Sequence, residues 1–327
     1  MILVKTPLRL SFFGGGSDLA AYYNKRPGFC LSTTIDQYMY ISICKTSIPG
    51  IKLMYSEIEI ANTIDEIKHD RVRESLDLFN IRSNLEIGSF AEIPTKGTGL
   101  GSSSTFTVGL LNGLSALTNN PMSRYDLAHT ASVVEIEYCN QPIGKQDQFA
   151  AAYGGFNSFT FTNERVDVSP VSVSKFATNT LNDQLLLFYT GIKRNTSDIL
   201  TEQQTNTNND KDTVDSLSTM IDIGKDALRS LYKGNIDDFG AMLGESWNHK
   251  KTLSSSISNP QIDEWYEKAL SSGALGGKIA GAGGGGFLLL YVPYAKQTKV
   301  IQAMERCGLT HFKFRFSESG SEIVYNN

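Results

Sequence analysis

A glycine-rich stretch at residues 97–104 constrains this chain more than any other part of its sequence. Glycine at every second position leaves backbone N–H groups without a shielding side chain, and the serines that follow can cap a helix and offer hydroxyl groups. The stretch reads Gly97-Thr98-Gly99-Leu100-Gly101-Ser102-Ser103-Ser104. Because a helix N terminus carries partial positive charge, the stretch predicts a turn and a helix start that bind phosphate. An ordinary loop before a core helix is the alternative.

The residues after this stretch predict the helix itself. Apolar side chains recur at helical spacing and make one buried face, formed by Phe106, Leu110, Leu114 and Leu117. Gly109 and Gly113 lie in the same segment. Because glycine has no side chain, these two positions allow the helix to pack closely against a neighbouring element.

Two common phosphate-binding signatures do not fit this chain. A Walker-type loop follows its glycines with a lysine, whereas Lys96 precedes them here, where it either touches phosphate or points to solvent. A dinucleotide-binding fold needs its G-x-G-x-x-G between a strand and a helix, but the match at residues 281–286 runs into the strand-like segment 287–292. The sequence therefore argues against a Walker-type NTPase and against a nicotinamide or flavin enzyme.

Length and charge narrow the choice of partner. The 327 residues, 40% of them hydrophobic, are enough for two packed domains. A net charge of −4, with 20% charged residues and no basic block, gives no electrostatic footprint for nucleic acid or for an anionic membrane. We therefore expect a small-molecule partner, with no nucleic acid and no membrane.

The cysteines and the first residues indicate a reducing compartment. The four cysteines form no C-x-x-C pair, and the four histidines are equally dispersed, so neither a disulfide framework nor a zinc site is indicated. The chain starts with Met1-Ile2-Leu3-Val4-Lys5 and not with a charged and then apolar leader. No segment approaches about eighteen consecutive apolar residues. We expect a soluble cytoplasmic protein.

Two acidic residues twelve positions apart are candidates for chemistry. On a helix predicted from Ser123 to about Tyr138, Glu135 falls on the small-residue face and Glu137 on the opposite face. A carboxylate that faces the core is costly unless a cation or a metal pairs with it. Asp147 opens a short apolar helix, where a helix N-cap is the plainer interpretation.

A second glycine turn lies near the N terminus. The run Phe13-Gly14-Gly15-Gly16-Ser17-Asp18 presents Ser17 and Asp18 at the end of a predicted strand. A tight hairpin turn capped by the aspartate is the alternative.

The composition turns polar between Lys193 and Thr213. Asparagine, threonine and glutamine dominate this segment, and Lys193 and Arg194 stand at its front. The composition predicts either a mobile flap or a solvated helix and loop. The segment also marks the expected transition between two domains.

Three motifs occur in a fixed order along the chain. They are the run from Thr6 to Asp18 with its G-G-G-S-D turn, the G-L-G-S-S-S run at 99–104, and the run from Lys278 to Gly286. Together they resemble the GHMP kinases, the superfamily of galactokinase, homoserine kinase, mevalonate kinase and phosphomevalonate kinase. The resemblance covers essentially the whole chain. It implies an α+β fold with a ribosomal-protein-like β-α-β domain at residues 1–180, a ferredoxin-like domain at residues 181–327, and a cleft for ATP and substrate.

The resemblance also implies roles for individual residues. The loop 97–104 would wrap the phosphates of ATP, and Ser103 and Glu135 would hold Mg²⁺. Asp147 would be the catalytic carboxylate, kept ionised by Arg9. The implied substrate positions are Ser17, Asp18, Gly144, Gly283 and Gly284.

A narrower resemblance is to the heptose 7-phosphate kinases. It rests on Pro7 to Asp18 with Tyr22, and on Gly144 to Gln148, although bacterial fucokinase-like domains share much of this pattern. It implies phosphorylation of the anomeric hydroxyl of D-glycero-D-manno-heptose 7-phosphate, by a monomer or homodimer, for surface polysaccharide synthesis. Lys193 and Arg194 are the candidates to bind the substrate phosphate, unless they only solvate a loop.

Three other activities are compatible with the same fold. A kinase of a free sugar, such as fucose, galactose or mannose, differs from the heptose kinase only in its substrate. A non-catalytic sugar or nucleotide sensor is disfavoured by the joint presence of Ser103, Glu135 and Asp147. A decarboxylase of the diphosphomevalonate type is disfavoured by the sugar-type G-G-G-S-D turn.

Overall fold

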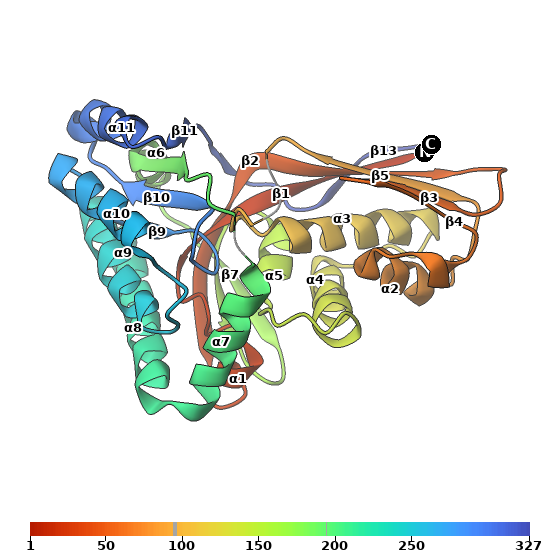
Figure 1. Cartoon of the computed structure of the whole chain (residues 1–327), viewed down its shortest axis with the longest axis horizontal. Helices are drawn as coiled ribbons and strands as arrows, with labels where there is room; N and C mark the ends of the chain where they lie inside the picture. The colour runs from red at the N-terminus through yellow and green to blue at the C-terminus, as the bar shows by residue number, and fades with distance from the viewer. Residues whose placement is uncertain (94–96, 194) are drawn as a thin grey trace.

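The computed structural model of the protein describes residues 1–93, 97–193 and 195–327. Within these residues the strands form two sheets, and helices cover them, as Figure 1 shows. The helices are α1 (Ala20–Tyr23), α2 (Asp70–Leu78), α3 (Ser102–Leu117), α4 (Arg124–Val133), α5 (Gln146–Tyr153), α6 (Lys175–Gln184), α7 (Thr196–Asn209), α8 (Lys211–Lys233), α9 (Ile236–Lys251), α10 (Pro260–Ser272) and α11 (Gln297–Arg306). The predicted α+β fold class is confirmed.

The strands divide between a larger and a smaller sheet. They are β1 (Ile2–Phe13), β2 (Gly28–Lys45), β3 (Ile51–Met54), β4 (Ile58–Ala61), β5 (Leu85–Ala91), β6 (Phe156–Phe161), β7 (Val166–Pro170), β8 (Leu185–Tyr189), β9 (Gly276–Ile279), β10 (Phe287–Tyr291), β11 (Thr310–Phe312), β12 (Phe316–Ser317) and β13 (Glu322–Asn326). The larger sheet follows the order β13-β1-β2-β5-β3-β4, with β6 and β12 also paired to β2, and β7 to β6. The smaller sheet has the order β11-β8-β10-β9.

The long β1–β2 pair anchors the turn that carries Asp18. The two strands are antiparallel from the Ile2–Ile43 pair to the Phe13–Leu31 pair. The register shifts after Pro7, a residue that has no N–H group to donate to the ladder. Because the turn follows directly on β1, a well-paired strand fixes where its side chains point.

Helices α2, α3, α4 and α5 lie together on one side of the larger sheet (Figure 1). The two glycines expected to permit close packing of α3 do so. A methyl group on Gly109 would lie 2.8 Å from Thr6 Oγ1, and one on Gly113 would lie 2.6 Å from Ile43 Cδ1. The tight contact of α3 with β1 and β2 therefore fixes the glycine-rich loop that precedes the helix.

One apolar cluster joins the two sheets. It contains Leu10 and Phe12 of β1, Phe239 of α9, and Leu187 and Leu289 of the smaller sheet, all fully or almost fully buried. The rings of Phe12 and Phe239 meet edge to face with centroids 5.2 Å apart. Each such side chain contributes roughly 1.5–3 kcal/mol when it is buried. This cluster holds the residues contributed by the two sheets in a fixed relation.

The chain does not divide simply into two halves, because its C-terminal strands return to the larger sheet. A boundary between residues 180 and 181 falls inside α6, and β12 and β13 at the end of the chain join the larger sheet. The termini lie side by side (Figure 1), and the Met1 amino group donates to Asn327 O at 2.8 Å. The division into residues 1–180 and 181–327 stays a prediction.

The polar segment after Lys193 contains a regular helix. Helix α7 buries Ile199, Gln203 and Thr207 along one face. Of the two structures that the composition of this segment allowed, a flap or a helix, the segment forms the helix. In the described parts of the chain, no helix is long and apolar enough to cross a membrane.

Candidate active site

A cavity of about 730 Å³ is lined by residues of both sheets and their helices. The predicted site residues in its wall are Arg9, Asp18, Gly97, Thr98, Gly99, Gly101, Ser102, Ser103, Ser104, Gly144, Asp147 and Lys193. Among the described residues, the predicted site positions that lie outside the wall are Ser17, Leu100, Glu135, Gly283 and Gly284. Arg194 and Lys96 lie outside the described residues. The cavity thus gathers the glycine-rich loop, the Asp18 turn and Asp147 in one place.

The glycine-rich loop enters helix α3 through left-handed backbone. Gly97, Gly99 and Gly101 have φ values of +71°, +80° and +78°, which L-residues with side chains adopt only with strain. Helix α3 begins at Ser102, so the partial positive charge of its N terminus faces the cavity wall. The Leu100 side chain points away from the cavity into the apolar core. Its carbonyl oxygen accepts the backbone N–H of Arg9 at 3.1 Å.

The glycine turn at residues 281–286 packs against this loop. A methyl group on Gly281 would lie 2.7 Å from Gly99 Cα, and one on Gly286 would lie 2.4 Å from Thr98 O. The Phe287 N–H donates to Thr98 O at 3.2 Å. The turn from the smaller sheet therefore supports the back of the loop.

Gly283 and Gly284, in the middle of the 281–286 turn, contact Ile257. The Gly284 N–H donates to Ile257 O at 2.7 Å, and a methyl group on Gly283 would lie 2.8 Å from the same residue. The parts of the turn that reach the cavity are Gly281 and Ala282. A substrate role for Gly283 and Gly284 stays a prediction.

Arg9 and Asp147 form a two-pronged ion pair in the cavity wall. Arg9 Nε donates to Asp147 Oδ1 at 2.7 Å, and Arg9 Nη2 donates to Asp147 Oδ2 at 2.6 Å. Arg9 Nη1 also donates to Gly99 O at 2.5 Å. Asp147 is not a helix N-cap, because its carboxylate is engaged with Arg9 and its residue lies inside α5. The arginine thus ties this carboxylate directly to the glycine-rich loop.

Asp18 organises the turn around it. Its Oδ1 accepts the Gly16 N–H at 2.9 Å, and its Oδ2 accepts the Gln146 N–H at 3.2 Å. Gly144 must be glycine here, because a methyl group would lie 1.9 Å from Asp18 Oδ2. Burial raises the pKa of Asp18, although the hydrogen bonds from Gly16 and Gln146 lower it. Ser17 supports the same turn from behind, because its hydroxyl donates to Gly14 O at 2.8 Å.

Glu135 is buried and paired with a cation, as its place on the core-facing stripe required. It lies in a π-helical turn (Val134–Tyr138) that follows α4, and it is 0% exposed. Arg71 Nε donates to Glu135 Oε1 at 2.7 Å, and Gln148 Nε2 donates to Oε2 at 2.6 Å. Burial lowers the pKa of Arg71, but the charge and hydrogen bond of Glu135, together with the charge of Asp70, raise it overall. Arg71 lies in the cavity wall in front of Glu135 and was not singled out from the sequence.

The predicted magnesium ligands Ser103 and Glu135 carry the type of donor atom that this ion prefers, and their role stays a prediction. Hydroxyl and carboxylate oxygens, such as those of Ser103 and Glu135, are the ligands that Mg²⁺ prefers. Each Glu135 oxygen accepts one hydrogen bond and keeps a lone pair. Gln148 Oε1 beside it is a buried acceptor without a partner among the described residues. The described residues contain no cluster of three His, Cys, Asp or Glu side chains that could hold a metal.

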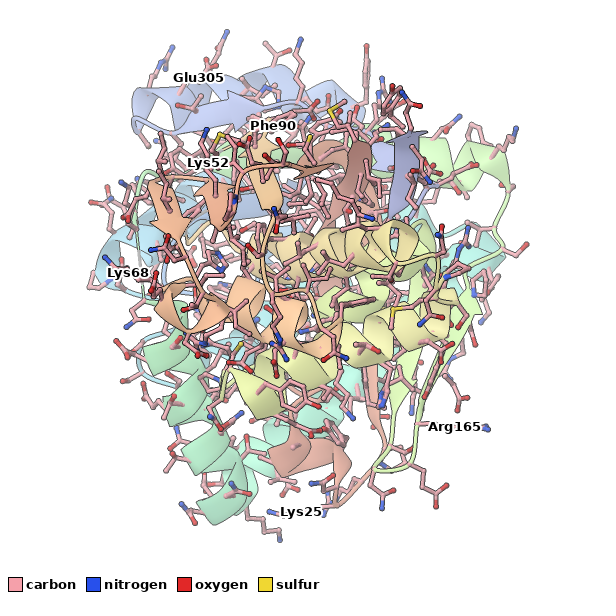
Figure 2. All side chains as sticks on the ribbon, turned by 90° about the vertical axis from the view of Figure 1, so that its right-hand side faces the viewer. Lys25, Lys52, Lys68, Phe90, Arg165 and Glu305 are labelled. Carbon is pink, nitrogen blue, oxygen red and sulfur yellow. The ribbon has the colours of Figure 1, made fainter. Side chains whose placement is uncertain are left out.

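One end of the cavity is aromatic. His69 packs between Tyr55 and Phe106, with ring centroids 5.1 Å and 4.9 Å away. Burial lowers the pKa of His69, so that the ring is neutral at pH 7, and its Nδ1 has no partner among the described residues. Phe90 of β5 also lines the cavity, and Figure 2 labels it in the upper part of that view, below the helix that carries Glu305. These residues come from separate elements without a shared motif, so sequence reasoning missed them.

Two lysines also line the cavity wall. Lys193 is exposed, whereas Lys250 of α9 is only 3% exposed and donates to Gly281 O. Thr196 and Ser197 of α7 lie in the same wall. Lys250 was not singled out from the sequence, since a lysine near a helix end carries no signal of burial.

Comparison with known proteins gives the family. A model described as GHMP kinases N terminal domain matches residues 61–155, and one described as GHMP kinases C terminal matches residues 227–309. D-glycero-alpha-D-manno-heptose 7-phosphate kinase of Campylobacter jejuni is 31% identical over 321 residues, which cover 93% of this chain and 93% of the relative. The chain belongs to the GHMP kinases. It is therefore an ATP-dependent phosphotransferase that acts on a hydroxyl group.

Solved structures of GHMP kinases share its fold. A D-glycero-D-manno-heptose 1-phosphate kinase from Bacteroides thetaiotaomicron matches with a TM-score of 0.82 and 24% identity over 100% of both chains. Lactococcus lactis galactokinase complexed with galactose matches with a TM-score of 0.77 and 18% identity, over 99% of this chain and 95% of that one. At these identities the likeness shows the fold alone. It agrees with the two-domain GHMP kinase fold expected from the three motifs.

Proposed function

We propose that this GHMP kinase transfers the γ-phosphate of ATP to the anomeric hydroxyl of D-glycero-D-manno-heptose 7-phosphate. The product is the 1,7-bisphosphate, a precursor of nucleotide-activated heptose for surface polysaccharides, made in the cytoplasm by a monomer or homodimer. The observation that carries the proposal is the Arg9–Asp147 pair, which joins a carboxylate to the glycine-rich loop inside the cavity that also contains Asp18. The Campylobacter jejuni relative supports the choice of sugar.

The nucleotide is proposed to lie along the loop and the aromatic end of the cavity. The backbone N–H groups at residues 97–104 and the α3 N terminus bind its phosphates, because they offer donors and a partial positive charge without the cost of desolvating a cation. The adenine stacks in the aromatic end, where His69 offers an unpartnered ring nitrogen. Ser103 and Glu135 would hold Mg²⁺, which neutralises charge on the transferring phosphate.

Asp147 is proposed to act on the attacking hydroxyl. It orients the anomeric hydroxyl toward the γ-phosphorus and accepts its proton as the new O–P bond forms and the bond to the ADP oxygen breaks. Arg9 holds both carboxylate oxygens and the loop carbonyl of Gly99, so it fixes the distance between base and phosphate. Asp18 and Gly144 position the sugar beside this pair, with Ser17, Gly283 and Gly284 supporting the two turns.

The substrate is tested by ADP release with heptose 7-phosphate, mannose, fucose and galactose offered in turn. We expect turnover with heptose 7-phosphate to exceed that with each free sugar by about ten- to a hundredfold in kcat/KM, since a charged contact contributes roughly 1.5–3 kcal/mol. Turnover of free sugars alone would discard the heptose assignment and leave a free-sugar anomeric kinase. Binding of sugar and nucleotide without ADP release would favour a sensor.

Removal of the His69 ring tests the placement of adenine. In His69→Ala we expect the KM for ATP to rise about three- to tenfold with kcat nearly unchanged, because a stacking contact contributes roughly 0.5–1.5 kcal/mol. The measurement is steady-state kinetics with ATP varied at saturating sugar phosphate. His129→Ala, an exposed histidine stacked on Tyr125 outside the cavity wall, serves as the control. An unchanged KM in His69→Ala would move adenine elsewhere.

A further inference from the structure

Helix α7 closes the part of the cavity next to the Asp18 turn. Thr196, Ser197, Leu200 and Gln203 all line the wall, and their spacing places them along one face of the helix. Asn195 caps the helix, since its side chain accepts the Ser197 N–H at 3.2 Å. The first turn of this 14-residue helix, with its partial positive charge, therefore borders the cavity. A helix terminus alone does not define a ligand.

Gln203 adds an independent sign that something binds here. Its side chain is 1% exposed and lines the cavity, and Nε2 has no hydrogen-bond partner among the described residues. Only glycine at position 16 leaves room for it, because a methyl group there would lie 2.1 Å from Nε2. Buried amide donors are nearly always satisfied in proteins. A ligand with an acceptor oxygen beside the Gly16 backbone would satisfy this one.

Lys250 gives the same corner a positive charge. It reaches the cavity from α9, and its Nζ lies 3.8 Å from where a methyl group on Gly15 would be. A lysine that is 3% exposed pays a large desolvation cost, which a negatively charged ligand offsets. Its Nζ donates to Gly281 O, which fixes the position of the ammonium group. Charge and an amide donor thus meet beside the Gly15–Gly16 turn, and the first turn of α7 borders the same cavity.

We propose that this corner, formed by Lys250, Gln203 and the first turn of α7, binds the phosphate that the sugar substrate already carries. The assignment rests on the proposed function and deepens it, because it names the residues that make the enzyme prefer a phosphorylated sugar. Lys250 is the main charge contact, while the exposed Lys193 attracts the substrate at the mouth. Tetrahedral oxygens suit the site, since the donors approach from two elements, α7 and α9.

The test compares binding of heptose 7-phosphate and of the dephosphorylated heptose, by calorimetry in the presence of a non-hydrolysable ATP analogue. In Lys250→Met we expect the affinity for heptose 7-phosphate to fall about 30-fold, because a charge-assisted contact is lost, while the affinity for the free heptose stays within twofold. Lys251→Met is the matched control, since Lys251 pairs with Asp263 outside the cavity. We expect it to bind both sugars like the wild type.

Other outcomes separate this assignment from the proposed function. If Lys250→Met lowers the affinity for both sugars equally, or lowers the affinity for the ATP analogue, Lys250 acts on the transferring phosphate. The assignment is then overturned. A wild-type preference for the phosphorylated sugar that survives in Lys250→Met also overturns it, with the proposed function intact. If the wild type itself shows no preference, the proposed function fails first.

A second variant keeps the test decisive if Lys250→Met unfolds. Gln203→Glu has nearly the same shape but replaces the N–H donor with an acceptor and a negative charge. We expect it to weaken heptose 7-phosphate binding at least tenfold and to leave the free heptose within twofold. Equal binding of heptose 7-phosphate by Gln203→Glu and the wild type would overturn the assignment.

Discussion

Replacement of Asp147 by asparagine should lower kcat by about a thousandfold while leaving nucleotide affinity within a few-fold of the wild type. General-base catalysis by a positioned carboxylate contributes roughly 10²–10⁴-fold. The amide keeps the size of the carboxylate but cannot accept the proton of the attacking hydroxyl. Its NH₂ group would also face the N–H donors of Arg9, which now bind both carboxylate oxygens at 2.6–2.7 Å. The measurement is kcat at saturating substrates, with calorimetry for the ATP analogue.

The control for Asp147→Asn is a second arginine–aspartate pair far from the chemistry. Asp183 pairs with Arg315 on the surface, where its side chain is 51% exposed, and it does not line the cavity. Exposed pairs of this kind contribute about 0–1 kcal/mol, so Asp183→Asn should change neither kcat nor nucleotide affinity measurably. Turnover of Asp147→Asn within tenfold of the wild type would remove Asp147 from the role of base.

A methyl group at Gly286 should both destabilise the enzyme and lower its affinity for ATP. Gly286 has φ of +83°, and its new Cβ would lie 2.4 Å from Thr98 O and 2.8 Å from Gly97 O, both backbone atoms of the phosphate loop. The backbone conformation costs roughly 1–2 kcal/mol and the forced shift about 1–3 kcal/mol more. We expect Gly286→Ala to lower the free energy of unfolding by about 3 kcal/mol, measured by urea titration, and to raise the KM for ATP.

Gly234 provides a matched control for the backbone term. It ends α8 with φ of +82°, almost the value of Gly286, but a methyl group on it would meet nothing within 4 Å. Gly234→Ala should therefore cost only about 1 kcal/mol and leave the KM for ATP unchanged. If both variants lose the same stability and neither changes the KM, the contact between the glycine turn and the phosphate loop does not matter for ATP binding.

The predictions that held were those carried by local patterns. The Ser123 hydroxyl accepts the Asp126 N–H at 3.1 Å at the start of α4, as its capping position predicted. Helical periodicity placed α3, and it also placed Glu135 on a buried face and Glu137 on an exposed one. The segment after Lys193 could be narrowed only to flap or helix, because its polar composition gives weak periodicity. Arg194 and Lys96 lie outside the described residues, and their roles stay predictions.

The site residues that the sequence did not predict contact partners that are distant in the sequence. Arg71 meets Glu135 across 64 positions, and Lys250 meets Gly281 across 31. The aromatic end takes Tyr55, His69 and Phe106 from three different segments. No spacing rule connects such residues, since their proximity depends on how helices pack on the sheet.

The sequence by itself determined the family, the order of its three motifs and the local geometry of each. Glycines that need positive φ, serines at a helix start and an acid on a small-residue stripe each impose a local conformation that short-range sterics and hydrogen bonding enforce. Only the tertiary structure decided which charges meet: Arg9 with Asp147, Arg71 with Glu135, and Lys250 with the cavity corner. These encounters follow from burial of the apolar clusters that pack the helices on the two sheets, and burial is not directional, so no local pattern encodes them.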